Sequence, residues 1–266
     1  MKPRCDAKNL LPVMFCLVAT FLFLGGCDSS PQKLPSSQGA SSSQSGSPSR
    51  GGGLFGKSTE DKRRETFNHL KDLVLGLQFY GDDHKFMFPP AYTVDANGKP
   101  LHSWRVLILP YIGQKELYRQ IKLDEPWDSE YNKQFHSRDI PCFRSAGANS
   151  QGHGLTDFSM VVGPDTISNG PTGRNLVHDI KDILYKIALV ERATPVCWMD
   201  PTEITQENAY KGIGVTPDGI ADAFYDGKTA VGACDGSVEM LEKTIDLKIL
   251  QSALNVTEDK QAGHAW

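Results

Sequence analysis

The sequence lacks the ligand spacings of a zinc site and the charge pattern of a nucleic-acid-binding protein. None of its 6 cysteines forms a C-x-x-C pair, and none of its 7 histidines forms an H-x-x-x-H pair. Zinc sites are usually built from such closely spaced ligands, so the sequence predicts none. Lys and Arg number 28 against 32 Asp and Glu, for a net charge of −4 and without a clustered basic face. Nucleic acid is therefore not an expected partner.

The apolar N-terminal run is too short to cross a bilayer as a helix. It covers residues 10–24, about fifteen residues, whereas a spanning helix needs about 20. A basic start with Lys2, Arg4 and Lys8 precedes it, and two small residues, Gly25 and Gly26, follow it. A charged, then apolar, then small segment is typical of a secretory signal, so we expect the folded part to lie outside the cytosol.

The residues that end this segment, Leu24-Gly25-Gly26-Cys27, resemble a bacterial lipobox. In that motif the cysteine takes a diacylglyceryl group and the signal is cut just before it. The resemblance implies a mature chain that starts at Cys27 and is anchored by its acyl chains, which together give stable attachment. An uncleaved single-span anchor is the alternative, and the sequence leaves inner and outer membrane open. Without residues 1–26 the net charge becomes −6, because Lys2, Arg4, Lys8 and Asp6 are lost.

A phosphate-binding motif occurs where the structure that it needs is missing. Gly51, Gly56, Lys57 and Ser58 match G-x-x-x-x-G-K-[ST], but this loop requires a strand before it. Residues 29–50 are rich in Ser, Gly, Gln and Pro and contain one Leu and one Ala as their only aliphatic residues. We therefore expect no nucleotide site, and no cofactor is predicted.

Composition divides the chain into four parts. We predict a lipoprotein signal peptide at 1–26, a disordered Ser/Gly-rich linker at 27–57, a folded domain at 58–256 and a frayed tail at 257–266. Gly/Ser-rich chains span about 5–6 Å × √n, so the linker would hold the domain roughly 30 Å from the bilayer.

Helical patterns dominate the first half of the domain. Ser58 and Asp61 resemble a capping box, and Gly81 is the expected end of an amphipathic helix of about twenty residues. Its apolar stripe consists of Phe67, Leu70, Leu73, Val74, Leu77 and Tyr80. A turn is predicted at 95–98, a buried helical segment at 104–112 that Pro110 kinks or ends, and a helix at 116–121. Asp128 is the expected cap of a short helix at 129–135.

Strand patterns dominate the second half. Candidate strands are 158–162, 183–190, 196–199, 229–234 and 238–241, followed by a closing helix at 246–254. Asp235-Gly236 predicts a hairpin with a type I′ turn between the last two strands. Helices first and an antiparallel sheet later predict an α+β domain.

Three cysteines remain in the expected mature chain beside Cys27. In an oxidising compartment, Cys142, Cys197 and Cys234 imply one disulfide and one leftover thiol. Cys197 and Cys234 both lie in strand-like segments, which favours their pairing, although spacing leaves the other pairings open.

Several blocks occur in order within a span of roughly 62–250, at residues 70–71, 88–90, 102–111, 126–129, 141–142, 162–164 and 235–238. Together they resemble one family, the large planctomycete domain-of-unknown-function family numbered 1559. The resemblance implies a type IV pilin-like architecture, with one long N-terminal helix laid on an antiparallel sheet. Members often carry a prepilin-like leader, which the lipobox and linker replace here, so assembly into a pilus is not implied. The cysteine that members tend to carry at the helix start is missing from 62–66, which leaves Cys142 without that partner.

The candidates for catalysis have structural explanations that we prefer. His102, Ser103 and Arg105 could be imagined as base, nucleophile and oxyanion donor, but neighbouring residues on one helical turn point in different directions. Ser103 as a helix cap and Arg105 as an ion-pair partner of Asp128 or Glu125 explain the same residues.

Acidic residues elsewhere suggest weaker alternatives. Asp82, Asp83 and His84 could hold a cation, but an acidic loop after a helix is usually solvated, and we expect no metal. Glu191 and Asp235 could face each other across the sheet, although ion pairs with Arg192 or Lys243 would suffice.

Three large aromatic residues leave open how the domain is used. Trp104, Trp127 and Trp198 could pack in the core, which is the commoner case, or line a ligand groove. We expect a non-enzymatic, exported, lipid-anchored protein with a structural or interaction role at the cell envelope. A module that binds a solute or glycan in that groove is the alternative, and a hydrolase ranks last. The partner would be the membrane, through the lipid, together with an unknown envelope protein or glycan.

Overall fold

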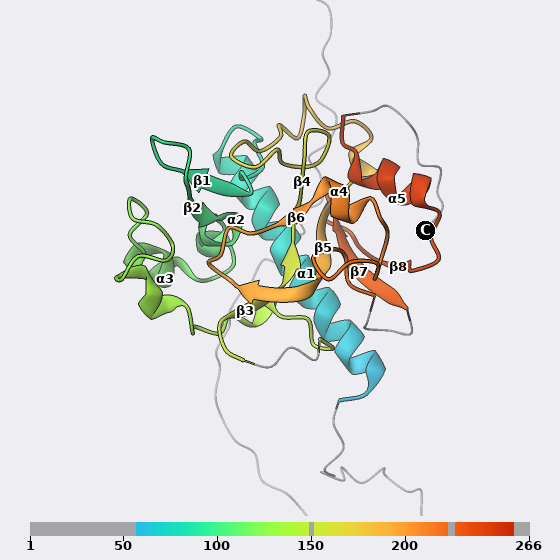
Figure 1. The fold of residues 1–266 in the computed structure, drawn as a ribbon, viewed down its shortest axis with the longest axis horizontal. Coiled ribbons are helices and arrows are strands. Elements are labelled where there is room, and N and C mark those ends of the chain that lie inside the picture. Colours follow the sequence, from blue (N-terminus) through green and yellow to red (C-terminus); the bar gives the residue numbers. More distant parts are fainter. Residues whose placement is uncertain (1–56, 149–151, 223–226, 258–266) are drawn as a thin grey trace, which may run out of the picture. The chain divides into compact units, whose positions relative to one another are not determined.

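A computed structural model describes residues 57–148, 152–222 and 227–257 (Figure 1). The predicted signal peptide, Cys27 and the linker up to residue 56 lie outside the described residues, as does the predicted tail after Thr257. In the part that is described, no helix has both the length and the apolar character needed to cross a membrane.

The folded part begins with one long helix, α1 (Thr59–Asp83). Ser58 caps it as predicted, because its hydroxyl accepts a hydrogen bond from the Asp61 N–H at 3.1 Å. The predicted apolar stripe faces the core, with Leu70, Leu73, Val74 and Leu77 fully buried. The helix passes its predicted end at Gly81, where a Cβ would lie 3.2 Å from the Leu176 side chain. Gly81 thus makes room for a neighbouring loop and does not terminate the helix.

A four-stranded antiparallel sheet lies against α1 and confirms the predicted α+β class (Figure 1). Its strand order is β3 (Leu155–Ser159), β5 (Ile187–Cys197), β7 (Lys228–Ala233) and β8 (Val238–Glu242). The strands predicted at 183–190 and 196–199 are one strand, β5, preceded by the short turn η4 (Ile183–Tyr185). β5 leaves the core after Arg192, where Ala193 and Thr194 are exposed, so its burial pattern does not continue along its whole length.

The sheet separates two hydrophobic clusters. Ala230 packs in the main cluster with the stripe of α1, whereas its neighbour Val231 lies in the second cluster with the helix α5 (Leu247–Leu254). This alternation is expected, because successive strand residues point to opposite faces. β7 also approaches α1 closely, since a Cβ at Gly232 would lie 2.4 Å from Val74 Cγ1. The predicted closing helix is confirmed, and Asp246 caps it through the Lys248 N–H at 2.7 Å.

The remaining elements are short. They are β1 (Tyr92–Val94), β2 (Pro100–Ser103), α2 (Trp104–Leu107), η1 (Leu109–Tyr111), α3 (Lys115–Gln120), η2 (Asn132–Phe135), η3 (Pro141–Phe143), β4 (Val161–Val162), β6 (Ile204–Thr205) and α4 (Gln206–Ala209). β1 and β2 pair around the predicted turn, and the predicted segment 104–112 divides into α2 and η1. The predicted strand 158–162 is split, because β4 pairs in parallel with β6 instead of continuing β3. The cap predicted for Asp128 is wrong, since the Ser129 hydroxyl accepts the Asn132 N–H at 3.1 Å.

The turn between β7 and β8 differs from its prediction. A type I′ turn needs positive φ at both central residues. Gly236 has φ +89°, but Asp235 is not among the residues with positive φ. Its carboxylate accepts hydrogen bonds from the N–H (2.9 Å) and hydroxyl (2.7 Å) of Ser237, which stabilises the turn in another form. The hairpin is confirmed, and the type I′ assignment is wrong.

The predicted disulfide between Cys197 and Cys234 is also wrong. Cys142, Cys197 and Cys234 are all free. Ile187, the first residue of the 11-residue strand β5, is paired with Ala233, so Cys234 lies near that end of β5 while Cys197 is at the other. At about 3.3 Å per residue the two cysteines are roughly 30 Å apart, whereas a disulfide needs Cα atoms within about 7 Å.

Candidate functional site

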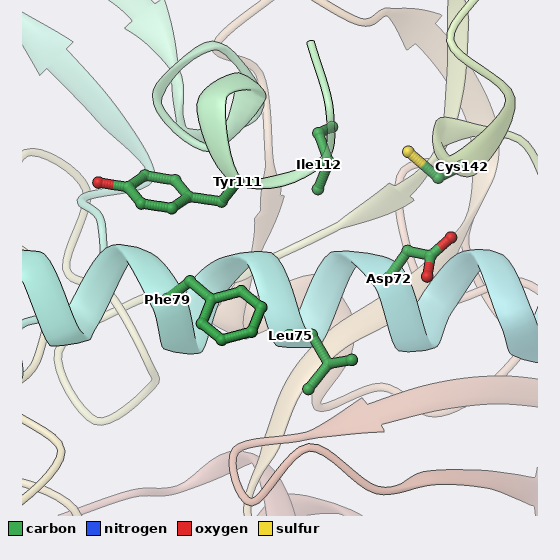
Figure 2. Close-up of a pocket in the computed structure, with 6 residues that line it drawn as sticks. All are labelled: Asp72, Leu75, Phe79, Tyr111, Ile112 and Cys142. Carbon is green, nitrogen blue, oxygen red and sulfur yellow. The ribbon is translucent and has the colours of Figure 1, made fainter. Parts of the chain in front are cut away.

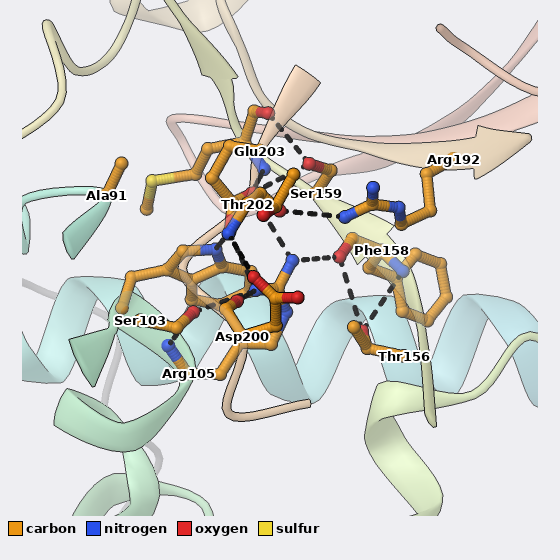
Figure 3. Close-up of polar contacts among 12 residues, drawn as sticks. Ala91, Ser103, Arg105, Thr156, Phe158, Ser159, Arg192, Asp200, Thr202 and Glu203 are labelled. Atoms are coloured by element: carbon orange, nitrogen blue, oxygen red, sulfur yellow. Dashed lines mark hydrogen bonds and ion pairs between the residues drawn. The ribbon is translucent and has the colours of Figure 1, made fainter. Parts of the chain in front are cut away.

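The polar residues of the block 102–105 are buried, and Figure 3 shows the contacts of Ser103 and Arg105. Arg105 is fully buried and binds Glu203 through two contacts, Nη1 to Oε1 at 2.6 Å and Nη2 to Oε2 at 3.2 Å. The predicted partners of Arg105 are therefore wrong. Glu125 pairs with Lys122 at 2.8 Å, and the pairing of β4 with β6 brings Glu203 to the end of β3 instead.

The neighbours of this ion pair satisfy most of its remaining hydrogen-bonding groups. Arg105 donates to the Ser103 hydroxyl at 2.7 Å and to the Phe158 carbonyl at 2.6 Å. Glu203 accepts from the Ser159 hydroxyl at 2.7 Å, the Met160 N–H at 2.8 Å and the Trp104 indole at 3.1 Å. Buried charges are tolerated when they are paired and hydrogen-bonded in this way. We interpret the cluster as a structural link between α2, β3 and the segment before β6.

His102 and Ser103 do not form a catalytic pair. Ser103 caps α2, as predicted, by accepting the Arg105 N–H at 3.3 Å. Both ring nitrogens of His102 are buried and have no hydrogen-bond partner among the described residues. Burial lowers the pKa of His102, so its neutral form is favoured at neutral pH. A base that makes no hydrogen bond to the hydroxyl beside it is not arranged to activate that hydroxyl.

The predicted tryptophan groove is wrong for two of its three members. Trp104 and Trp198 are fully buried and both pack on Phe143, with ring centroids 6.4 Å and 5.9 Å apart. Trp127 is half-buried and stacks on His136 at 5.0 Å. The large rings of Trp104 and Trp198 fill the core beside η3, so they cannot line an open ligand groove.

An open groove of about 280 Å³ lies beside α1 instead (Figure 2). Figure 2 shows Asp72, Leu75 and Phe79 on the helix and Tyr111, Ile112 and Cys142 on segments that run alongside it. Phe79 is 51% exposed, although it belongs to a helix whose opposite side is packed into the core. The sequence carries a signal for two of these residues. Leu75 and Phe79 are four residues apart and lie outside the predicted stripe, so they form a second apolar row on the helix.

Cys142 is the one thiol among the described residues that line this groove, and its surroundings disfavour the thiolate. Burial raises the pKa of Cys142 to about 12, and the negative charge of Asp72 acts in the same direction. The thiolate is the reactive form of cysteine. At neutral pH the group therefore contributes a small apolar surface to the groove and no nucleophile.

A second hollow, of about 460 Å³, lies at the C-terminal end of α1. It is lined by Tyr80, Asp83, His84, Lys85, Met87, Phe88, Pro90, Pro171, Thr172 and Gly173. His84 stacks on Tyr80 at 3.8 Å, and Asp83 accepts the Tyr111 hydroxyl at 2.9 Å. Burial, followed by the contact with Asp83, raises the pKa of Tyr111 to about 12. The cation site considered at Asp82, Asp83 and His84 gains no support, because no group of three metal-ligating side chains occurs in the described part of the chain.

The rim of this hollow is a backbone turn that its sequence does not favour. Lys85 and Phe86 have φ of 58° and 63°, a left-handed conformation that costs an L-residue about 1–2 kcal/mol. The turn is held by a hydrogen bond from the Leu176 N–H to the Phe86 carbonyl (2.8 Å) and by one from the Asn175 side chain to the Lys85 carbonyl (3.1 Å). The Phe86 side chain is 50% exposed.

The acidic residues considered as a pair across the sheet do not meet. Glu191 lies inside β5, whereas Asp235 lies in the turn after β7 and binds Ser237. Glu191 makes no ion pair with Arg192, which donates to the Thr202 carbonyl at 2.9 Å. Lys243 pairs with Asp222.

One protein-family model matches part of the chain. Residues 63–182 match the model of the family described as "Protein of unknown function (DUF1559)". This range includes most of α1, the block 102–105 and all six residues that line the groove beside α1. No curated protein and no solved structure gives a significant match. The resemblance predicted from the sequence is confirmed over this range, and it assigns no activity.

Proposed function

We propose that this chain is an exported, lipid-anchored protein of the cell envelope whose pilin-like domain binds a partner protein through the groove beside α1. One contrast supports this role. The polar side chains of the block 102–105 are buried, and most are engaged with one another, whereas an exposed aromatic side chain, Phe79, lines an open groove. Binding therefore fits the arrangement of side chains better than catalysis does.

The composition of the groove resembles that of a protein interface more than that of a solvated helix face. Aromatic residues are enriched in interfaces and often supply much of the binding energy. Here Phe79 and Leu75 provide an apolar centre, with Tyr111 and Ile112 opposite and Asp72 as a polar edge. A partner that covered Phe79 would remove from water a large apolar surface that is half exposed in this chain.

The anchored part of this role depends on Cys27. The acyl chains would hold the mature chain at a membrane, and residues 27–57 would act as a tether roughly 30 Å long. α1 begins directly after this tether, at Thr59. The domain would then be displayed outside the cytosol, close to either the inner or the outer membrane.

We expect Cys27→Ala to abolish metabolic labelling of the protein with palmitate, because this thiol is the proposed acceptor of the lipid. Cys16→Ala is the matched control, since Cys16 would leave with the signal peptide and its variant should be labelled like the natural chain. Labelling that persists in Cys27→Ala would refute the lipid anchor without bearing on the groove.

The groove is tested in living cells with a photo-reactive side chain at position 79 of the full-length chain. We expect a discrete adduct with one protein, and we expect Leu75→Lys in the same chain to remove most of it, because a charge would enter the apolar centre. The same photo-reactive group at position 97, in the exposed turn between β1 and β2, is the control and should give no such adduct. Identical patterns at 79 and 97 would count against a binding surface.

A solute- or glycan-binding module is the second candidate, and the hollow at the end of α1 favours it over the tryptophan groove. Its lining combines Tyr80 and Phe88 with exposed polar residues such as Thr172, which suits a ligand with apolar and hydroxylated faces. A photo-reactive group at position 172 that captures sugar, with no protein adduct at position 79, would support this candidate in place of the first.

A further inference from the structure

A carboxyl group without a counter-ion lies at the centre of the sheet. Glu191, in β5, is 3% exposed, and it forms no ion pair with any positively charged group of the described residues. Its Oε2 accepts the Ala230 N–H at 2.7 Å and the Thr229 hydroxyl at 3.3 Å, both from β7. Its Oε1 lies 2.5 Å from the Ser145 hydroxyl oxygen, in the segment after η3. The group is thus held by neutral donors alone.

The charges around Glu191 favour its neutral form. From β3, Asp157 is 2% exposed and precedes Phe158, the residue paired with Glu191 across the sheet. Arg144 donates to Asp157 at 3.0 Å, and its carbonyl oxygen lies 2.7 Å from Nδ1 of His69 of α1. From β5 itself, Arg192 donates to the carbonyls of Thr194 and Thr202. An ionised Glu191 would therefore add a second buried negative charge beside Asp157. The nearby cation, Arg144, is bound to Asp157 and forms no ion pair with Glu191.

The same carboxyl group is connected to α1 through one hydroxyl. The Ser145 oxygen lies 3.2 Å from the hydroxyl of Thr66, a fully buried residue of α1, and the Ala146 N–H donates to that hydroxyl at 3.0 Å. When Glu191 carries a proton, it can donate to Ser145, and the Ser145 hydroxyl can then donate to Thr66. When Glu191 is ionised, the Ser145 hydroxyl must turn toward the carboxylate. The proton on Glu191 therefore sets the direction of the hydrogen bonds between β5 and α1.

We propose that Glu191 is a proton-binding site built into the interface between α1 and the sheet, which holds the N-terminal half of α1 in place when protonated and loosens it when ionised. The site goes beyond the proposed binding function, because it controls the helix that carries the groove and requires neither the lipid nor a partner. Its residues lie on α1, β3, β5 and β7 and in the segment after η3, so one proton acts on several elements at once.

The sign of the pH dependence follows from the direction of the shift. Burial raises the pKa of Glu191, and Asp157 acts in the same direction, while the hydrogen bonds from Ala230, Ser145 and Thr229 oppose them. A carboxyl group whose pKa is higher in the folded state gives its full stabilisation below its unfolded pKa, and this stabilisation falls as pH rises toward the folded pKa. The domain should therefore be more stable in mildly acidic than in neutral or alkaline solution.

Denaturant unfolding of the full-length chain in detergent, measured from pH 4 to pH 9, tests this. Between the ordinary pKa of glutamate and the raised one, one proton changes the unfolding constant about tenfold per pH unit. We expect Glu191→Gln to remove that dependence, because the amide keeps the shape and cannot ionise. Glu242→Gln is the matched control, since Glu242 is exposed and pairs with Lys228 at the surface, and it should keep the dependence. A Glu191→Gln variant with the pH dependence of the natural chain would overturn the proposal.

Two measurements on the natural chain keep the test decisive if Glu191→Gln fails to fold. In a titration followed by NMR of ¹³C-labelled glutamate carboxyl groups, we expect one resonance to titrate at a higher pH than the others. Amide hydrogen exchange over residues 62–70, corrected for its intrinsic pH dependence, should accelerate over the same pH range, while residues 76–80 change less. Glutamates that all titrate together, or exchange that is uniform along α1, would refute the site or its link to α1, respectively.

Discussion

Replacement of Arg105 by methionine should lower the free energy of unfolding by about 3–5 kcal/mol. Among the described residues, Arg105 is the one ion-pair partner of Glu203, whose side chain is 2% exposed, so the substitution leaves an unpaired carboxylate in the core. It also removes the donors to the Phe158 carbonyl and the Ser103 hydroxyl. Denaturant unfolding followed by the fluorescence of the buried tryptophans measures the loss.

Two companion variants separate the buried charge from the loss of a side chain. Arg105→Met combined with Glu203→Leu should cost much less than Arg105→Met alone, because a buried ion pair can often be replaced by apolar residues with little net change. Arg119→Met breaks the exposed pair between Arg119 and Glu116, and should change stability by at most about 0.5 kcal/mol. A loss in Arg105→Met as small as that in Arg119→Met would show that this ion pair does not stabilise the fold.

Gly154→Ala should destabilise the fold by about 3 kcal/mol or more, since it combines backbone strain with a steric clash. Gly154 has φ +65°, and a Cβ there would lie 1.6 Å from the His136 carbonyl oxygen. The glycine cannot move away easily, because its N–H donates to Asp139 at 2.8 Å and its carbonyl accepts the Trp198 N–H at 2.9 Å. The midpoint of denaturant unfolding is the measurement.

Gly98→Ala is the control for the steric part of this effect. Gly98 also has positive φ, +81°, but no atom lies within 4 Å of the position of its Cβ. Its substitution should therefore cost only the conformational penalty, about 1 kcal/mol. Equal losses at the two positions would mean that the clash with His136 is relieved by a movement that this structure does not indicate.

The elements that sequence reasoning predicted well are those whose signals are local. The start of α1 follows from Ser58 and Asp61, and its buried face follows from a stripe with helical spacing. The hairpin of β7 and β8 was predicted in the same way from the turn at Asp235 and Gly236, and α5 was predicted as a closing helix. Each signal lies within a few residues of the element that it specifies, so no knowledge of tertiary contacts was needed.

The buried cluster could not be predicted because its partners are far apart in the sequence. Arg105 and Glu203 are separated by 98 residues, and their contact depends on β4 pairing with β6, two strands of two residues each. Strands this short have no periodic pattern, so local reasoning instead assigned Arg105 to the nearby acidic residues Asp128 and Glu125. The predicted disulfide failed for a related reason, because strand-like surroundings do not reveal which ends of two strands lie together.

The groove beside α1 could be predicted only in part from the sequence. Leu75 and Phe79 could have been identified as a second apolar row, but the residues opposite them come from η1 and η3, whose placement depends on the tertiary fold. A ligand groove was considered at Trp104, Trp127 and Trp198 because these side chains are large and aromatic. Trp104 and Trp198 are in fact fully buried, as the commoner behaviour of large apolar side chains would suggest.

The strand β5 links the stabilities of the two sides of the sheet. Ala188 and Leu189 belong to the main hydrophobic cluster, and Ile187 and Val190 belong to the second. If β5 detached, both clusters would lose packing at the same moment. A substitution that loosened this strand would therefore weaken the packing of α1 and of α5 together.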